Sequence, residues 1–322
     1  MQDRGDAHEA AHLAARRAAA RSVIEIEKTN LRTPDDLRAA EAEALAAMRS
    51  GVDVIFQAPG HRRNHMVTAN KTRAAWVELS TDDPAASREF YSALLGWNIE
   101  ISEDPQYGGY AMARLGEGDG DVAGITAKMM PEAPTAWSLY LETDDAAALC
   151  DAVQAAGGTV IAPAFDVGDM GRMAVFSDPT GAVISAWQAG ATRTFRSGEA
   201  GTYGWAELNS RGLDKAIDFY GTVFGWRTET TPIGEGQPDC TQFYVDDDAI
   251  AGAMEMQSVI PAEVPSYWMI YFNVADLDDA FKRAVDLGAT EVVPPTAMPG
   301  GHFSIINDPQ GAMFGLLKMD EG

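Results

Sequence analysis

The sequence predicts an α+β fold in which two tandem domains, each built from two βαβββ modules, follow a short N-terminal helical appendage. Three observations support this prediction. The chain of 322 residues contains an internal repeat with an offset of 128 to 131 residues, each copy alternates between strand and helix periodicity in the same order, and the charge balance changes after residue 65. A repeat of this length indicates a duplicated domain rather than a solenoid unit.

The repeat is clearest where each copy begins. Residues 76–97 read WVELSTDDPAASREFYSALLGW and residues 205–226 read WAELNSRGLDKAIDFYGTVFGW, so WxEL, FY and GW align without a gap. The match continues in the VAG and IAG tripeptides that start at Val122 and Ile250, and in the DPxG turns, which we expect to be capped by their Asp side chains. We place the first domain at 70–190, a Gly/Thr/Ser/Arg-rich linker at 191–202 and the second domain at 203–320.

Local patterns define the elements of the first copy. Ala75–Ser80 alternates as a half-buried strand, and Asp83-Pro84 begins a helix with one apolar stripe that ends at Gly96. Three strands follow, and the order then repeats, which gives two βαβββ modules per domain. The later expected elements are strands Asn98–Ser102, Tyr110–Leu115, Asp121–Met129 and Ala136–Glu142, helix Asp145–Ala156, and strands near Val160–Ala162, Arg172–Ser177 and Ala182–Gln188.

The charge distribution excludes several function classes. Of 48 acidic and 24 basic residues, residues 1–65 hold ten of each, so the net charge of −24 lies entirely after residue 65. A body this acidic repels phosphate backbones and anionic lipids, which argues against nucleic-acid and membrane partners. No apolar run approaches the roughly 18 residues of a membrane helix, and Cys150 and Cys240 form no disulfide framework. We therefore expect a cytoplasmic protein.

Residues 1–65 differ from the repeats. Helices are expected at Ala7–Arg21 and Pro34–Ser50, and short strands at Val23–Glu27 and Val52–Gln57. The stretch from Ala39 to Ala58 resembles the N-terminal part of a RecB-like nuclease family, without the downstream strand that carries the catalytic acid there. We interpret the segment as a fusion or an early start, with Met66 as an alternative start of the tandem protein.

The paired modules, the FY…GW helix end and the late DPxG turn resemble the vicinal-oxygen-chelate superfamily, in particular its tandem-domain actinobacterial members. This superfamily contains glyoxalase I, extradiol dioxygenases and bleomycin-resistance proteins. The resemblance covers residues from about 70 to 320. It implies two tandem glyoxalase-like domains, in which each pair of modules curls into a cup that holds the ligand.

The resemblance also implies where a divalent metal would bind, on His, Glu or Gln of particular strands. No usual metal ligand stands at the three positions that can be placed in each domain, and Glu255 is the only carboxylate close to a fourth. Because a catalytic site needs about three protein ligands, we expect no metal and no other cofactor. The six positions hold Trp76, Ser138 and Ser185 in the first domain, and Trp205, Met269 and Gly315 in the second.

Strand alternation predicts the interior of the cups. Glu78 and Glu207 are the candidate catalytic residues, because each shares the expected interior face with a tryptophan two positions earlier. A carboxyl group in such surroundings can act as a general acid or base, or pair with a ligand cation, but both glutamates could instead be structural. The candidate ligand-binding residues on the interior faces are Trp76, Ser138, Tyr140, Ser185, Trp187, Trp205 and Tyr271.

Two further polar residues are candidates for ligand contact. His302 is the only histidine within the repeats, and it aligns with Arg172; each follows a glycine at a strand start. They are interpreted either as polar residues near the surface or as groups that contact a substrate anion or transfer a proton.

These observations favour a metal-independent protein that binds a small organic molecule in one or both cups. The first alternative is an enzyme, such as a lyase, isomerase or hydroxylase, that uses Glu78 or Glu207 as acid or base. The second alternative is a structural or interaction role without catalysis. The sequence leaves the ligand and the oligomeric state open, and pairing of the two domains within one chain is one possibility.

Overall fold

A computed structural model describes residues 72–116, 120–129, 132–190, 195–231, 239–256, 260 and 262–320. The elements expected within residues 1–65, the RecB-like resemblance and the alternative start at Met66 lie outside the described residues. In the described part of the chain, none of the helices combines the length and the apolar character needed to cross a membrane.

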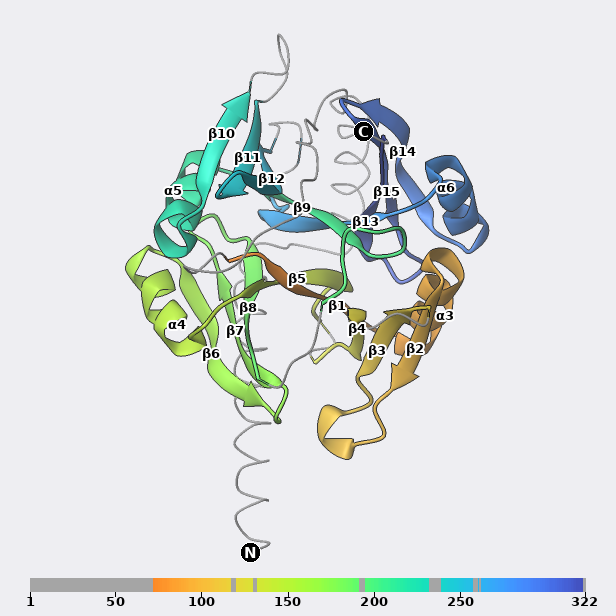
Figure 1. Ribbon diagram of the computed structural model, residues 1–322, viewed down its shortest axis with the longest axis horizontal. Coiled ribbons are helices and arrows are strands. Elements are labelled where there is room, and N and C mark those ends of the chain that lie inside the picture. Colours follow the sequence, from red (N-terminus) through yellow and green to blue (C-terminus); the bar gives the residue numbers. More distant parts are fainter. Residues whose placement is uncertain are drawn as a thin grey trace, which may run out of the picture.

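The first domain is a single curled sheet of eight strands with two helices on its outer side (Figure 1). Its strand order is β2-β3-β4-β1-β5-β8-β7-β6, so the first strands of the two modules pair at the centre. This confirms the predicted βαβββ modules. The elements are β1 (Ala74–Thr81), α3 (Pro84–Leu95), β2 (Trp97–Ile101), β3 (Ala111–Leu115), β4 (Asp121–Ala127), β5 (Ala136–Glu142), α4 (Ala146–Ala155), β6 (Thr159–Val167), β7 (Gly171–Ser177) and β8 (Val183–Ala189), with a short 3-10 helix at Pro105–Tyr107.

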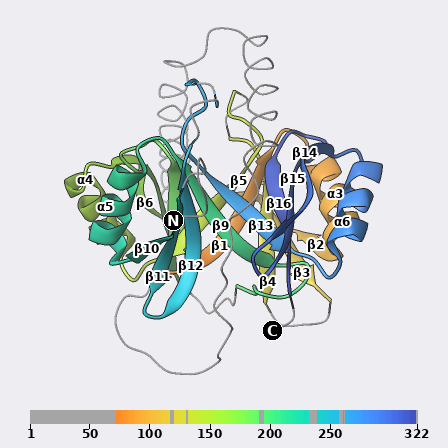
Figure 2. The ribbon, with the colours of Figure 1, turned by 90° about the horizontal axis from the view of Figure 1, so that it is seen from above.

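The second domain repeats this architecture with the strand order β10-β11-β12-β9-β13-β16-β15-β14. The concave faces of the two sheets point away from each other (Figure 1), and each helix of one domain lies beside a helix of the other (Figure 2). The elements are β9 (Tyr203–Ser210), α5 (Leu213–Phe224), β10 (Arg227–Thr231), β11 (Cys240–Val245), β12 (Asp248–Glu255), β13 (Tyr267–Asn273), α6 (Leu277–Asp286), β14 (Thr290–Met298), β15 (Gly301–Asn307) and β16 (Met313–Met319).

Local chemistry sets the ends of α3 as the sequence indicates. The Asp83 carboxylate accepts hydrogen bonds from the amides of Ala85 (3.1 Å) and Ala86 (3.0 Å), and Pro84 occupies the first turn, where its missing N–H costs nothing. Gly96 ends the helix at φ 75°, in the left-handed region that favours glycine. The helix buries Phe90, Tyr91 and its other apolar positions against the sheet.

One strand is much longer than the sequence indicates. The expected strand near Val160–Ala162 extends from Thr159 to Val167 and passes through Pro163. Proline is tolerated there because β6 is an edge strand and its pairing with β7 shifts register between Ala162 and Phe165.

The two domains share one hydrophobic core. The buried side chains of the helix-covered faces form a single cluster that includes Leu79 and Phe176 from the first domain and Phe219 and Phe314 from the second. Aromatic rings cross the boundary: the centroid of Trp137 lies 4.9 Å from that of Phe272. Burial of this size is the main favourable term that holds the domains together.

The repeated FY and GW motifs make reciprocal contacts across this boundary. Trp97 Nε1 donates to the carbonyl of Gly201 (2.6 Å), just before the first strand of the second domain. Trp226 Nε1 donates to the carbonyl of Thr72 (2.9 Å), just before the first strand of the first domain. Each copy of the motif therefore fixes the entry of the chain into the other domain.

The DPxG turns carry a second pair of reciprocal contacts. Asp178 and Asp308 cap their own turns as predicted; Asp308 Oδ1 accepts from the amide of Ala312 at 2.8 Å. Their other carboxylate oxygens accept from tyrosines of the opposite domain: Tyr91 bonds to Asp308 at 2.9 Å and Tyr220 to Asp178 at 3.2 Å. The sequence indicated the turns but not these bonds between domains.

Candidate functional site

Cup 1, the concave face of the first sheet, contains a cavity of about 1100 Å³. Trp76, Glu78 and Ser80 of β1 face it, whereas Val77 and Leu79 are fully buried on the helix side. The predicted strand faces are therefore correct. The cavity is also lined by Ser138, Tyr140 and Glu142 of β5, Ser185 and Trp187 of β8, and residues 265–269 and Met313 of the second domain.

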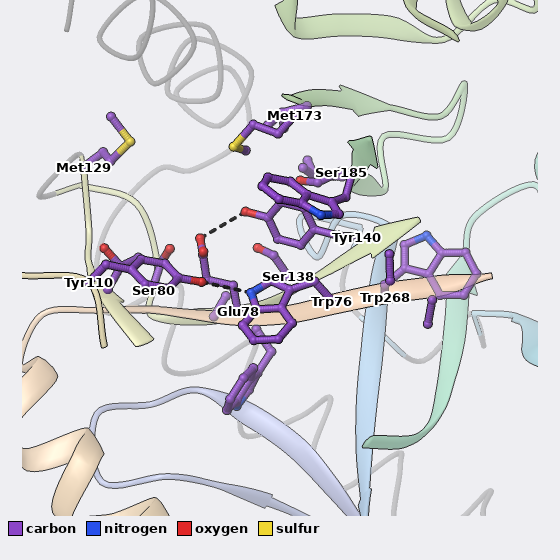
Figure 3. A pocket seen from close by; sticks show the side chains of 18 of the residues that line it. Trp76, Glu78, Ser80, Tyr110, Met129, Ser138, Tyr140, Met173, Ser185 and Trp268 are labelled. Atoms are coloured by element: carbon purple, nitrogen blue, oxygen red, sulfur yellow. Dashed lines mark hydrogen bonds between the residues drawn. The ribbon is translucent and has the colours of Figure 1, made fainter. Parts of the chain in front are cut away.

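A hydrogen-bonded cluster lies at the centre of cup 1 (Figure 3). The Tyr140 hydroxyl donates to Glu78 Oε1 at 3.0 Å, and Trp76 Nε1 donates to the Tyr110 hydroxyl at 2.9 Å. The pKa of Tyr110 is raised well above its usual value, mainly by burial. The negative charge of Glu78 and a hydrogen bond between Tyr110 and Glu78 add to this shift. The Glu78 carboxylate therefore lies between two protonated tyrosine hydroxyls, which fix its position.

Gly124 of β4 makes this cluster possible. A Cβ atom at Gly124 would lie 1.8 Å from the Tyr110 hydroxyl oxygen and 3.1 Å from Trp76 Nε1, so both side chains lie across the bare backbone of this residue. This accounts for the glycine of the repeated VAG tripeptide. The sequence prediction missed Tyr110, which lies just before β3, because uneven loops hide its register relative to Gly124.

Among the described residues that line cup 1, the two basic ones are paired with acids. Arg114 contacts Glu100 (2.7 Å) and Asp121 (2.9 Å). Lys128 contacts Asp82 (2.7 Å) and donates to the carbonyl of Ala133 (2.6 Å). The Glu78 carboxylate, in contrast, accepts a hydrogen bond from the Tyr140 hydroxyl at 3.0 Å.

Arg172 and His302 lie away from the cavity. Arg172 is not among the side chains that line cup 1; it shares its strand face with buried Ala174 and forms an ion pair with Asp166 (2.8 Å). His302 is exposed on β15, between buried Gly301 and Phe303. Their placement agrees with the interpretation as polar residues near the surface, and neither joins the cluster around Glu78.

Cup 2, the concave face of the second sheet, has Glu207 at the position that corresponds to Glu78. Glu78 pairs in register with Gly124 and Ser138, and Glu207 pairs with Gly252 and Met269. The surroundings differ, because the half of cup 2 formed by β13–β16 is filled by a buried apolar cluster. Its members are Met269, Tyr271, Val292, Val293, Met298, Phe303, Ile305 and Leu317.

One substitution between the copies reorients a tyrosine. Tyr140 pairs with Ser185 in cup 1, and Tyr271 pairs with Gly315 in cup 2. A Cβ at Gly315 would lie 2.0 Å from the Tyr271 ring, so this ring lies flat on the strand. Tyr140 extends toward Glu78 instead, and the two cups therefore present their equivalent tyrosines differently.

Glu207 occupies a markedly desolvated site. Its side chain is 3% exposed, and burial raises its pKa to about 7, opposed by the hydrogen bond from the Asn209 amide at 3.3 Å. Burial penalises the charged form of a carboxyl group, which accounts for the direction of the shift. The pKa of the candidate residue Glu207 therefore lies near neutral pH.

Comparison with known proteins identifies the family. The sequence profile of the Glyoxalase/Bleomycin resistance protein/Dioxygenase superfamily matches residues 73–185 and 202–316, and the chain belongs to this superfamily. "Putative glyoxylase CFP32" of Mycobacterium tuberculosis is 38% identical over 253 residues, covering 76% of this chain and 93% of the relative. "Anthracycline biosynthesis protein DnrV" of Streptomyces peucetius is 34% identical over 264 residues, covering 77% and 94%.

Solved structures share the fold. The Mn(II)-bound glyoxalase from Novosphingobium aromaticivorans aligns with a TM-score of 0.55 at 17% identity, covering 77% of this chain and 83% of that one. The 2,2',3-trihydroxybiphenyl 1,2-dioxygenase from Sphingomonas wittichii aligns with a TM-score of 0.55 at 16% identity, covering 77% and 90%. At these identities the likeness establishes the fold alone.

The side chains of this chain do not fit the divalent metal that the superfamily implies. The positions equivalent to metal ligands hold the six residues named above, which offer indole, hydroxyl, thioether or no side-chain donors. Glu255 has a different role, since its carboxylate accepts from the amides of Gly212 (2.9 Å) and Leu213 (2.6 Å) at the start of α5. Within the described residues, no group of three or more His, Cys, Asp or Glu side chains could hold a metal ion.

The shortage of metal-ligating side chains predicts a low metal content. After dialysis, the purified protein should contain well under one equivalent of zinc, nickel, iron or manganese, because a tight site needs about three protein ligands. Inductively coupled plasma mass spectrometry checks this. Stoichiometric metal that survives dialysis, and is lost on Glu78→Gln or Glu255→Gln, would contradict the assignment of the ligand positions.

Proposed function

We propose that cup 1 binds a small, flat organic molecule. The observation that carries this proposal is the cavity of about 1100 Å³, whose lining includes aromatic side chains of both modules together with the fixed carboxylate of Glu78. Ligand sites typically combine apolar and aromatic walls with a few placed polar groups that set orientation. Trp76, Tyr140 and Trp187 supply ring faces, while Ser138, Ser185 and Glu78 supply hydrogen-bonding groups.

The name of one relative supports a flat ligand. Anthracyclines, to whose biosynthesis DnrV is assigned by name, contain four fused rings, three of which form a planar anthraquinone, and the cavity has the size and the aromatic walls for a molecule of that class. Hydroxyl groups on such a ring system would donate to Glu78, which accepts but cannot donate when ionised.

An enzyme that uses Glu78 as general acid or base is the second candidate. The arrangement that favours it is the carboxylate held between Tyr140 and Tyr110, because a general base must have a fixed position relative to its proton. The tyrosine hydroxyls would then also polarise a carbonyl group of the substrate.

Replacing Glu78 by glutamine distinguishes these functions. With alizarin, a planar dihydroxyanthraquinone, as probe, we expect calorimetric titration to show wild-type binding with quenching of tryptophan fluorescence. Glu78→Gln should weaken this binding by about 1–3 kcal/mol, the scale of a lost hydrogen bond to a charged group. A catalytic Glu78 would instead lose about 10²–10⁴-fold in turnover with little change in affinity, once a substrate carried through purification is identified by native mass spectrometry.

The exposed Glu263→Gln variant is the matched control, because it removes one charge outside the cavity. Absence of alizarin binding to the wild-type protein would contradict a flat aromatic ligand. Unchanged affinity in Glu78→Gln would show that this carboxylate is structural.

A further inference from the structure

The carboxyl group of Glu207 in cup 2 has an incomplete set of partners. Among the described residues, Glu207 Oε2 is buried and has no hydrogen-bond partner, and Oε1 receives only the long bond from Asn209. The hydroxyl of Tyr267 is likewise buried without a hydrogen-bond partner in the described part of the chain. An unpartnered buried polar group costs about 1–3 kcal/mol, and more if charged, so native proteins usually satisfy such atoms with a bound molecule or water.

Three aromatic side chains lie around this carboxyl group. Trp205 precedes Glu207 on the same face of β9, and a Cβ at Gly252 would lie 3.1 Å from Trp205 Nε1 and 3.6 Å from Glu207 Oε2, so both side chains cross the same glycine. Tyr271 is the cross-strand neighbour of Trp205. Burial is the main cause of the raised pKa values of Tyr267 and Tyr271, and the nearby charge of Glu207 adds to both.

Among the residues that the structure describes, no positively charged side chain acts on the pKa of Glu207. Burial raises the pKa of Glu207, and the hydrogen bond from the neutral Asn209 amide lowers it. Cys240, the other titratable side chain that the charge of Glu207 affects, has a pKa raised to about 11 and stays a neutral thiol. A carboxylate enclosed by aromatic faces and lacking a protein cation is complementary to a small organic cation.

We infer that cup 2 is a second binding site, for a small organic ammonium ion that contacts the Glu207 carboxylate and the rings of Trp205, Tyr267 and Tyr271. Ring faces attract alkylammonium groups through their negative quadrupole. The apolar cluster that fills the other half of cup 2 limits the ion to a few heavy atoms. Tyr267 and Met269, the cross-strand neighbour of Glu207, are also among the residues that line the large cavity, whereas Glu207 itself is not.

Choline and its uncharged carbon isostere, dimethylbutanol, test this site. The two probes have the same shape and differ in charge. We expect calorimetric titration of the full chain, at a pH of about 8 so that Glu207 is ionised, to show choline binding at least about tenfold tighter than the isostere, or about 1.4 kcal/mol. Equal affinity for the two probes, or no choline binding, would overturn the inference.

Variants then locate the ion. Glu207→Gln should weaken choline binding at least about tenfold with a thermal midpoint no lower than that of the wild type, while Glu207→Asp, which keeps the charge, should retain measurable preference for choline over the isostere. Trp205→Leu should also weaken it. Glu78→Gln changes the matching position in cup 1. If choline affinity falls in Glu78→Gln and not in Glu207→Gln, the ion binds in cup 1 and the inference is wrong.

Discussion

Above a pH of about 7, the Glu207→Gln variant is expected to be more stable than the wild-type protein. Burial raises the pKa of Glu207 from its ordinary value of 4.5 to about 7 in the folded state, so the folded protein prefers the protonated form. A group whose folded pKa is raised contributes stability that is present below a pH of about 4.5 and is lost as the pH rises to about 7. The loss amounts to at most about 3.5 kcal/mol, at roughly 1.4 kcal/mol per pKa unit, and glutamine avoids it.

Urea unfolding of both proteins at several pH values from about 5.5 to about 8.5 measures this effect. Burial also raises the pKa values of Asp178 and Asp308, so the informative quantity is the difference between wild type and variant at each pH. That difference should grow as the pH rises to about 7 and then level off. Glu263→Gln, which removes an exposed charge, controls for the change in net charge. A difference that is independent of pH would show that the pKa of Glu207 is not raised into this pH range.

Removing the carboxylate of Asp308 is expected to destabilise the whole protein by about 3 kcal/mol or more. This side chain is 3% exposed and accepts from the amides of Gln310 and Ala312 and from the hydroxyl of Tyr91 in the other domain. Asp308→Ala leaves these donors buried without an acceptor. It also removes one of the two reciprocal bonds between the domains.

Urea unfolding followed by near-ultraviolet circular dichroism checks this prediction. Tyr91→Phe should cost less than Asp308→Ala, because it removes the bond between domains and leaves the turn intact. Asp247→Ala, at an exposed turn, is the control and should change stability by less than about 0.5 kcal/mol. Similar stabilities for Asp308→Ala and Asp247→Ala would show that the turn does not couple the two domains.

The fold was predictable because its elements carry local signals. The duplicated WxEL and FY…GW patterns gave the repeat, and the caps Asp83 and Gly96 gave the ends of a helix. The length of β6 was not predictable from local patterns, because whether Pro163 interrupts a strand depends on its being at a sheet edge. Contacts between domains, such as Tyr91 with Asp308, link residues 217 positions apart and have no local signature.

The candidate site was predictable in part for the same reason. The period of two placed Trp76 and Glu78 on the interior face, and the cavity confirms that placement. The residue that completes the cluster, Tyr110, lies just before β3 and follows loops of uneven length, so its register could not be inferred. The difference between cups follows from a contact across strands, Ser185 in one copy against Gly315 in the other, whose effect on the paired tyrosine requires coordinates.

Successive side chains of β1 point alternately into the core and into the cavity, so mutations at neighbouring positions affect different properties of the protein. Val77 and Leu79 belong to the core shared by both domains, whereas Trp76 and Glu78 face the cavity. The four reciprocal hydrogen bonds that join the domains involve residues that do not line the cavity of cup 1. Ligand preference can therefore change through substitutions at every second residue without loss of the assembled scaffold. A duplicated chain of this kind can keep one cup for an existing ligand while the other acquires a new specificity.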